Sequence, residues 1–181
     1  MSEQVLSTET SSAQATKELA ARLSELARSG DLVVLVGDLG AGKTAFTQGF
    51  AEGLGVQEHV TSPTFALVRS YSGRLDLHHL DVYRLEHVNE ALDLGLAEML
   101  DDDAVMIIEW GDTIAPVLPH QYLEIRLSYG NDHNSRVITW RAVGDQWTAR
   151  SRALQAVVAA ASNDGGVGDS VPTGTDEANN K

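Results

Sequence analysis

Residues 37–44 read Gly37-Asp38-Leu39-Gly40-Ala41-Gly42-Lys43-Thr44 and match the pattern G-x-x-x-x-G-K-[ST] at every position. A continuous apolar run at 32–36 precedes them, as in a strand buried on both faces, and a helical pattern to about Leu54 follows. Glycines let such a loop point successive backbone N–H groups at phosphate oxygens, beside the positive end of a helix. The stretch therefore predicts a nucleotide-phosphate site, with Lys43 on the β- and γ-phosphates and Thr44 as an oxygen ligand of Mg²⁺.

The nucleotide is expected to be ATP. A GTPase of the usual kind carries Asn-Lys-x-Asp for guanine recognition and Asp-x-x-Gly after the second strand. Neither pattern occurs anywhere in the sequence. ATP is thus favoured by the absence of guanine-recognition motifs.

The remaining sequence predicts strands that alternate with helices. Apolar periodicity predicts helices at 12–28, 90–100 and about 148–161, with Leu92 of the second facing inward. Strands are predicted at 65–71, 75–81, 105–108, 123–129 and 136–143, with hairpins joining the first two and the last two. These elements favour a single-domain α/β fold of the P-loop NTPase type, with a mixed parallel and antiparallel sheet flanked by helices.

The two ends of the chain differ in composition from its middle. Residues 1–11 are polar and are expected to form a flexible lead-in to a P-loop ATPase domain at 12–161. Residues 162–181 are rich in Gly, Asp, Asn, Ser and Thr and offer almost nothing to bury. We therefore expect a disordered acidic tail at 162–181.

The overall composition excludes several classes of protein. There is no cysteine among the 181 residues, which excludes disulfides, thiolate zinc sites and a cysteine nucleophile. No apolar run approaches the roughly 20 residues that span a bilayer, and the polar, acidic start shows no secretory signal. We expect a cytoplasmic protein without membrane contact. The net charge of −13 argues against a surface that grips nucleic acid directly.

Two acidic residues end predicted strands where a P-loop protein needs a carboxylate. Glu109 follows the apolar run 105–108, and Asp81 ends the strand 75–81. Each could hold the metal directly, hold it through water, orient the attacking water, or simply cap a turn. The run 101–103, three aspartates, is instead expected to be a solvated turn.

Other polar and aromatic residues are weaker candidates. Ser62 and Thr64 precede a strand, in a loop that could sense the γ-phosphate or could be a plain Ser-Pro turn. Trp110 follows Glu109, and its side chain could either pack in the core or lie over the nucleotide pocket. Adjacent histidines on a strand face opposite ways, so we expect structural roles for His78 and His79. Surface positions are expected for a further set of possible phosphate partners, Arg69, Arg74, Arg84 and Arg136.

Four blocks of sequence carry a resemblance to a known family. They are the loop 37–44, Val-Thr-Ser-Pro-Thr-Phe at 60–65, His-Leu-Asp-Val-Tyr-Arg-Leu at 79–85 and Ile-Glu-Trp at 108–110. In this order they resemble TsaE, also called YjeE, the bacterial ATPase family of tRNA threonylcarbamoyladenosine biosynthesis. The resemblance extends over about residues 15–143. The loop pattern is shared by many families, but the four blocks together are specific.

The resemblance implies an activity and partners. TsaE-like proteins bind and slowly hydrolyse ATP with Mg²⁺, and act with TsaD and TsaB in threonylcarbamoyl transfer to adenosine 37 of tRNAs reading ANN codons. Contact with tRNA is then only indirect, through the complex. The family often has a second hydroxyl after Thr44, where this chain has Ala45, so help from that hydroxyl is absent.

The resemblance also implies roles for individual residues. Phosphates are bound by the loop residues Asp38, Leu39, Gly40, Ala41, Gly42, Lys43 and Thr44. Thr44 and Glu109 hold Mg²⁺, Asp81 supports hydrolysis, and Lys43, Asp81 and Glu109 form the catalytic set. Ser62 and Thr64 form the γ-phosphate-sensing loop, Trp110 lies near the nucleotide, and adenine lies near 12–16.

Two other functions remain open from the residues. A stand-alone kinase of a small metabolite would need a second substrate pocket and usually an arginine-rich lid, and no arginine cluster is present. A non-catalytic module that uses ATP as a switch would not need two acidic residues at strand ends. Transfer of phosphate to an added acceptor would indicate the kinase, and turnover insensitive to Asp81 would indicate the switch.

Overall fold

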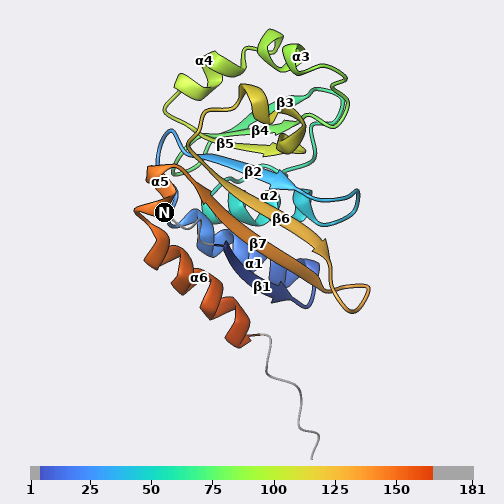
Figure 1. Ribbon diagram of the computed structural model, residues 1–181, viewed down its shortest axis with the longest axis vertical. Coiled ribbons are helices and arrows are strands. Elements are labelled where there is room, and N and C mark those ends of the chain that lie inside the picture. Colours follow the sequence, from blue (N-terminus) through green and yellow to red (C-terminus); the bar gives the residue numbers. More distant parts are fainter. Residues whose placement is uncertain (1–4, 165–181) are drawn as a thin grey trace, which may run out of the picture.

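A seven-stranded sheet in the order β1-β7-β6-β2-β5-β4-β3 forms the centre of the protein (Figure 1). The computed structural model describes residues 5–164. The strands are β1 (Val5–Thr10), β2 (Leu32–Val36), β3 (Val68–Tyr71), β4 (Leu77–Asp81), β5 (Val105–Glu109), β6 (Tyr122–Tyr129) and β7 (Arg136–Val143). Strands β6, β2, β5 and β4 are parallel, while β3, β7 and β1 pair antiparallel towards the edges. The predicted mixed α/β sheet is confirmed.

Helices cover both faces of this sheet (Figure 1). They are α1 (Ala13–Ser24), α2 (Lys43–Gly53), α3 (Val88–Asp93), α4 (Leu96–Asp101), the 3-10 helix η1 (Gly111–Val117), α5 (Asp145–Thr148) and α6 (Ser151–Asp164). Helices α1, α2 and α6 pack on one face, and α3, α4 and η1 on the other. All five residues of β2 are buried, because both faces of this central strand are covered.

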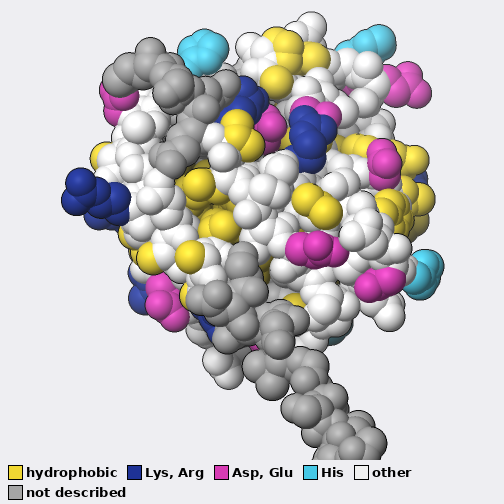
Figure 2. All heavy atoms as spheres, turned by 60° about the horizontal axis from the view of Figure 1, so that its bottom comes forward, with side chains coloured by type: hydrophobic (Ala, Val, Ile, Leu, Met, Phe, Trp, Pro, Cys, Tyr) yellow, Lys and Arg dark blue, Asp and Glu magenta, His cyan; other side chains and the backbone are white. Residues whose placement is uncertain are grey.

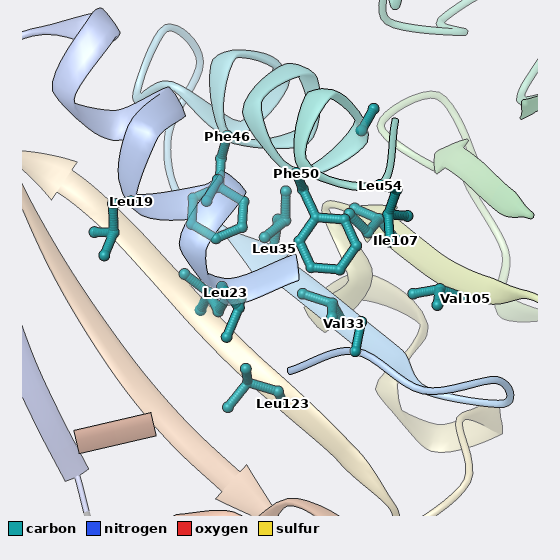
Figure 3. Packing of buried hydrophobic residues seen from close by; sticks show 14 of the residues in the cluster. Leu19, Leu23, Val33, Leu35, Phe46, Phe50, Leu54, Val105, Ile107 and Leu123 are labelled. Carbon is teal, nitrogen blue, oxygen red and sulfur yellow. The ribbon is translucent and has the colours of Figure 1, made fainter. Parts of the chain in front are cut away.

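Figure 3 shows how α1 and α2 cover the first face. Phe46 and Phe50 of α2 and Leu23 of α1 are fully buried against Val33 and Leu35 of β2. A buried aromatic side chain of this size contributes several kcal/mol, since its removal typically costs about 3–5 kcal/mol. This packing fixes the start of α2, and with it the loop 37–44, against the end of β2.

The expected flexible lead-in at 1–11 is wrong for residues 5–10. They form β1, which pairs antiparallel with β7 from Val5↔Arg141 to Thr10↔Arg136. Thr8 and Thr10 alternate towards the interior and are buried, and the Thr10 hydroxyl lies 2.7 Å from that of Thr16. A polar strand can be buried in this way because paired hydroxyls and ladder bonds satisfy its polar groups.

Several predicted element boundaries also need correction. The predicted helix 90–100 is two helices, because Gly95 adopts a left-handed conformation (φ +77°) between α3 and α4, and Leu92 is 47% exposed rather than inward. The predicted strand 65–71 begins only at Val68, since Leu67 also has positive φ. The last helix runs to Asp164, beyond the expected start of the tail. The rest of that tail, 165–181, lies outside the described residues.

The strand register places the predicted acidic residues in one row. Glu109 of β5 lies opposite Leu35 of β2 on one side and opposite Asp81 of β4 on the other. All three strands are parallel, so this row lies at their common carboxyl edge, where the loop after Val36 begins. Open α/β sheets bind ligands at this edge.

A buried ion pair ties the C-terminal helices to the start of β2. The guanidinium of Arg150 donates to both carboxylate oxygens of Asp31, at 2.6 and 2.7 Å, and also to the carbonyl of Leu26. It lies 3.8 Å from the ring of Trp147. Arg150 is 8% exposed and Asp31 is 3% exposed, so neither charge can be solvated by water instead.

Arg150→Met is expected to lower the free energy of unfolding by about 3–5 kcal/mol, because it leaves the Asp31 carboxylate buried without its charged partner. Urea denaturation measures this change. Arg152→Met, on the exposed side of α6, is the matched control and should stay within about 0.5 kcal/mol of the parent. A loss below about 1 kcal/mol in Arg150→Met would contradict this account of the pair.

Candidate nucleotide-binding site

A cavity of about 350 Å³ lies at the carboxyl edge of β2, β4 and β5. Its lining consists of Leu39, Gly40, Gly42, Lys43, Thr44, Ala45, Ser62, Thr64, Asp81, Tyr83, Glu109 and Trp110. Most of the site residues predicted from the sequence therefore meet at one place. Asp38 and Ala41 belong to the same loop but lie outside this lining.

The side chain of Lys43 is folded back onto its own loop. Its Nζ donates to the carbonyl oxygens of Gly37 at 2.6 Å and of Asp38 at 2.9 Å, and lies 3.8 Å from the centre of the Trp110 ring. Burial lowers the pKa of Lys43 below its ordinary value, and nearby carboxylates, Glu109 first, act in the opposite direction. The loss of water around this buried ammonium group is thus offset by the two carbonyl oxygens and the Trp110 ring.

Both oxygen atoms of Glu109 have partners. The Thr44 hydroxyl donates to Oε2 at 3.1 Å, and the Nε2 atom of His79 donates to Oε1 at 2.8 Å. The histidine must be the donor, because an ionised carboxylate only accepts. His79 is fully buried and Glu109 is 3% exposed. This chain of contacts fixes the orientation of the carboxylate next to Thr44.

His79 is a site residue that the sequence interpretation did not assign to the site. The structural role expected for it holds, since its ring is buried and bonded, but the bond goes to a predicted metal ligand. One signal was available: His79 lies two positions before Asp81, and residues two apart on a strand share a face. His78 instead bonds Ser70 and Asp102.

Asp81 is bonded to the loop that carries Ser62 and Thr64. Its Oδ2 atom accepts from the Ser62 hydroxyl at 2.6 Å and from the Thr64 hydroxyl at 3.1 Å. Its Oδ1 atom accepts from the backbone N–H of Tyr83 at 3.1 Å. The two hydroxyls are 2.7 Å apart. One carboxylate therefore ties the segment with Ser62 and Thr64 to the backbone that follows β4.

Trp110 occupies a strained backbone position at the inner side of the cavity. It is one of two described non-glycine residues with positive φ, at 63°, and its N–H donates to the carbonyl of Leu35. Its ring lies 4.8 Å from that of Tyr83, as well as over Lys43. A strained conformation persists where surrounding contacts hold it in place. Here the hydrogen bond to Leu35 and the two ring contacts do so.

The oxygen donors present suit Mg²⁺ when phosphates complete the coordination. Thr44 and Glu109 offer a hydroxyl and a carboxylate oxygen within 3.1 Å of each other. Within residues 5–164, no group of three His, Asp or Glu side chains is placed to hold a metal ion alone. Mg²⁺ is typically bound through one or two protein oxygens together with substrate phosphates and water, so the residues fit this ion.

The region expected to lie near adenine, residues 12–16, does not line the 350 Å³ cavity. Ser12 caps α1 by accepting from the N–H of Ala15 at 3.1 Å. Both residues line a second cavity of about 220 Å³, which shares no lining residue with the first. The placement of adenine near 12–16 stays a prediction.

The arginines expected at the surface have defined partners. Arg69 donates to the Thr61 hydroxyl, Arg74 to the carbonyl of Ser24, and Arg84 lies over the Phe65 ring. None of these three lines the cavity. Arg136, by contrast, bonds carbonyls of the loop 37–44.

Comparison with known proteins identifies the family. The family model of threonylcarbamoyl adenosine biosynthesis protein TsaE matches residues 10–138. The chain belongs to the TsaE family. Over 133 residues it is 45% identical to the tRNA threonylcarbamoyladenosine biosynthesis protein TsaE of Bacillus subtilis, covering 73% of this chain and 82% of that protein. The TsaE of Treponema pallidum is 44% identical over 126 residues, covering 70% and 93%.

A solved structure supports the same fold. The crystal structure of YdiB from Bacillus subtilis aligns with a TM-score of 0.73 at 35% identity, covering 87% of this chain and 96% of that one. Membership of the TsaE family places the chain among the proteins of threonylcarbamoyl adenosine biosynthesis. No helix within residues 5–164 is long and apolar enough to cross a membrane.

Asp81→Ala in this TsaE-family chain is expected to loosen the loop around Ser62 and Thr64, because both hydroxyls lose their acceptor. Amide hydrogen exchange should accelerate about tenfold at Leu67, whose N–H donates to the carbonyl of Pro63. Asp93→Ala, on the exposed side of α3, is the control. Unchanged exchange at Leu67 would show that Asp81 does not order the loop.

Proposed function

We propose that this TsaE-family chain binds ATP with Mg²⁺ in the 350 Å³ cavity and hydrolyses it in support of threonylcarbamoyl transfer to tRNA. One observation carries the proposal: the Thr44 hydroxyl and the Glu109 carboxylate meet beside Lys43, where the loop 37–44 leads into helix α2. A phosphate-binding loop, a cation and a pair of hard oxygen ligands are the parts that phosphoryl transfer requires.

The loop and its lysine bind the phosphates. Backbone N–H groups at the start of α2 face an anion favourably, because they lie at the positive end of the helix. Lys43 leaves the carbonyls of Gly37 and Asp38 and places its ammonium against the β- and γ-phosphates. Its burial strengthens that attraction, since charge interactions are screened less away from water.

Thr44 and Glu109 would hold Mg²⁺, and His79 keeps Glu109 aligned through Oε1 while Oε2 faces Thr44. When bound, Mg²⁺ neutralises negative charge on the β- and γ-phosphate oxygens. This role needs a carboxylate that is held in a fixed direction, and the hydrogen bond from His79 provides that.

Hydrolysis forms a bond from a water oxygen to the γ-phosphorus and breaks the bond from that phosphorus to the bridging oxygen, which leaves on ADP. The proton of the water passes to the phosphate product or to solvent. The chain contributes positioning rather than covalent chemistry. Asp81, with Ser62 and Thr64, closes the side of the cavity where the γ-phosphate and the water meet.

We further propose that the chain acts in the cytoplasm with TsaD and TsaB, and reaches tRNA only through that complex. The net charge of −13 opposes direct binding of a polyanion. Figure 2 supports this view for one face, on which acidic and basic side chains of the described residues are interspersed and no basic patch forms.

ATP turnover by the purified protein tests the chemistry. Lys43→Ala should lower the turnover number by about 100-fold or more, because it removes a charge that stabilises the transferring phosphoryl group. Glu109→Ala and Asp81→Ala should lose turnover more than ATP affinity. Arg126→Ala, a 54%-exposed arginine of β6, controls for loss of charge. Equal turnover in all variants would remove these residues from the mechanism.

Addition of TsaD and TsaB to the purified protein tests the proposed partnership. We expect the two proteins to stimulate ATP turnover, and the stimulation to vanish in Lys43→Ala. Steady turnover without any stimulation would leave an ATPase without these partners. Transfer of the γ-phosphate to an added small-molecule acceptor would indicate a kinase instead.

A further inference from the structure

The tip of the β6–β7 hairpin contacts the outer side of the loop 37–44. The Tyr129 hydroxyl donates to the carbonyl of Leu39 at 2.8 Å. Arg136 donates from Nη2 to the carbonyl of Gly40 at 3.3 Å and from Nε to the carbonyl of Ala41 at 3.0 Å. Three successive carbonyls of the loop are therefore bonded to one hairpin, about 90 residues away in the sequence.

We propose that Tyr129 and Arg136 are positioning residues that hold the loop in its phosphate-binding conformation. The proposal rests on the proposed binding of ATP at this loop. We call the two residues the loop brace. Neither lines the 350 Å³ cavity, so both act through the loop backbone and not on the ligand.

The bonding of Arg136 separates this role from direct phosphate binding. Its Nη1 donates to the carbonyls of His133 at 3.0 Å and Ser135 at 2.7 Å, in addition to the two loop bonds from Nη2 and Nε. A guanidinium has five N–H donors, so four are used on carbonyls. Its Cζ atom also lies 4.6 Å from the centre of the Tyr129 ring. An arginine with four carbonyl bonds, outside the lining of the cavity, is placed to hold backbone and not to contact a γ-phosphate.

The hairpin tip is built to present these carbonyls to Arg136. Asp132 accepts from the N–H groups of Asn134 and Ser135, both at 2.8 Å, and these backbone bonds lower the pKa of Asp132. A Cβ atom at Gly130 would lie 2.2 Å from the Ser135 hydroxyl, so a side chain there would displace that hydroxyl. The tip is thus a defined structure against which the loop is held.

The geometry of a peptide group explains why holding carbonyls matters. In a trans peptide the N–H lies opposite the C=O. Carbonyls of Leu39 and Ala41 directed at the brace therefore turn the N–H groups of Gly40 and Gly42 away from it, and these two glycines line the cavity. Gly40 and Gly42 also have φ of +79° and +106°. A loop so rich in flexible residues loses much entropy on ordering, and a brace reduces that loss on binding.

Two variants test the brace in the full-length protein. Arg136→Met removes two bonds to the loop, and Tyr129→Phe removes one with almost no change in shape. In nucleotide-free protein, amide exchange at residues 39–42 should accelerate by about tenfold and about threefold, respectively. The dissociation constant and KM for ATP should rise by similar factors, while kcat at saturating ATP stays near the parent value. Arg136→Lys should restore part of the loss.

Arg126→Met is the matched control, because it removes an arginine from the same hairpin without touching the loop. A purely structural role predicts a lower thermal midpoint and faster exchange throughout the sheet, and this result would overturn the proposal. Parent-like exchange and ATP affinity in both Tyr129→Phe and Arg136→Met would also overturn it. A parent protein that binds no ATP would refute the proposed function, whereas the exchange of the free loop would still report on the brace.

Discussion

The parallel register of β2, β5 and β4 is the constraint on which the site depends. It puts Leu35, Glu109 and Asp81 in one row at the carboxyl edge of the sheet, one residue before β2 ends. A shift of one residue would turn Glu109 and Asp81 to the other face, because side chains alternate along a strand. The helices on both faces enforce the register, since β2 and β5 are buried along their whole length.

Ionisable side chains gather at this edge of the sheet, in an otherwise apolar interior. Lys43, His79, Asp81 and Glu109 are all buried, and each is bonded to another group of the site or the loop. Buried charges without partners are costly, so each contact here also fixes the direction of a functional group. Burial lowers the pKa of Lys43 because it removes water from the ammonium group. An anion would therefore stabilise this group more than the two carbonyl oxygens that it now contacts.

The sequence predicted the parts of the site that depend on local pattern. The loop motif is contiguous, and Glu109 and Asp81 stand where apolar runs end, so their shared edge follows from parallel strands. Contacts between distant segments carry no such signal: Arg136 meets Gly40 across 96 residues. Strand β1 was missed because its inner face carries two threonines, Thr8 and Thr10, and only one apolar side chain, that of Leu6. The break at Gly95 was missed because one glycine within an apolar helical pattern is usually tolerated.

The two sides of the cavity are held by different kinds of contact. On one side the loop is fixed by strand β2, helix α2 and three carbonyl bonds from the β6–β7 hairpin. On the other, the side chains of Ser62 and Thr64 are both bonded to one carboxylate, that of Asp81, and the neighbouring Phe65 is 87% exposed. Segments with few buried contacts have the lowest free energy of local opening. If the proposed binding of ATP holds, we therefore expect a change between nucleotide states to fall on the Ser62–Thr64 side more than on the side of the loop 37–44.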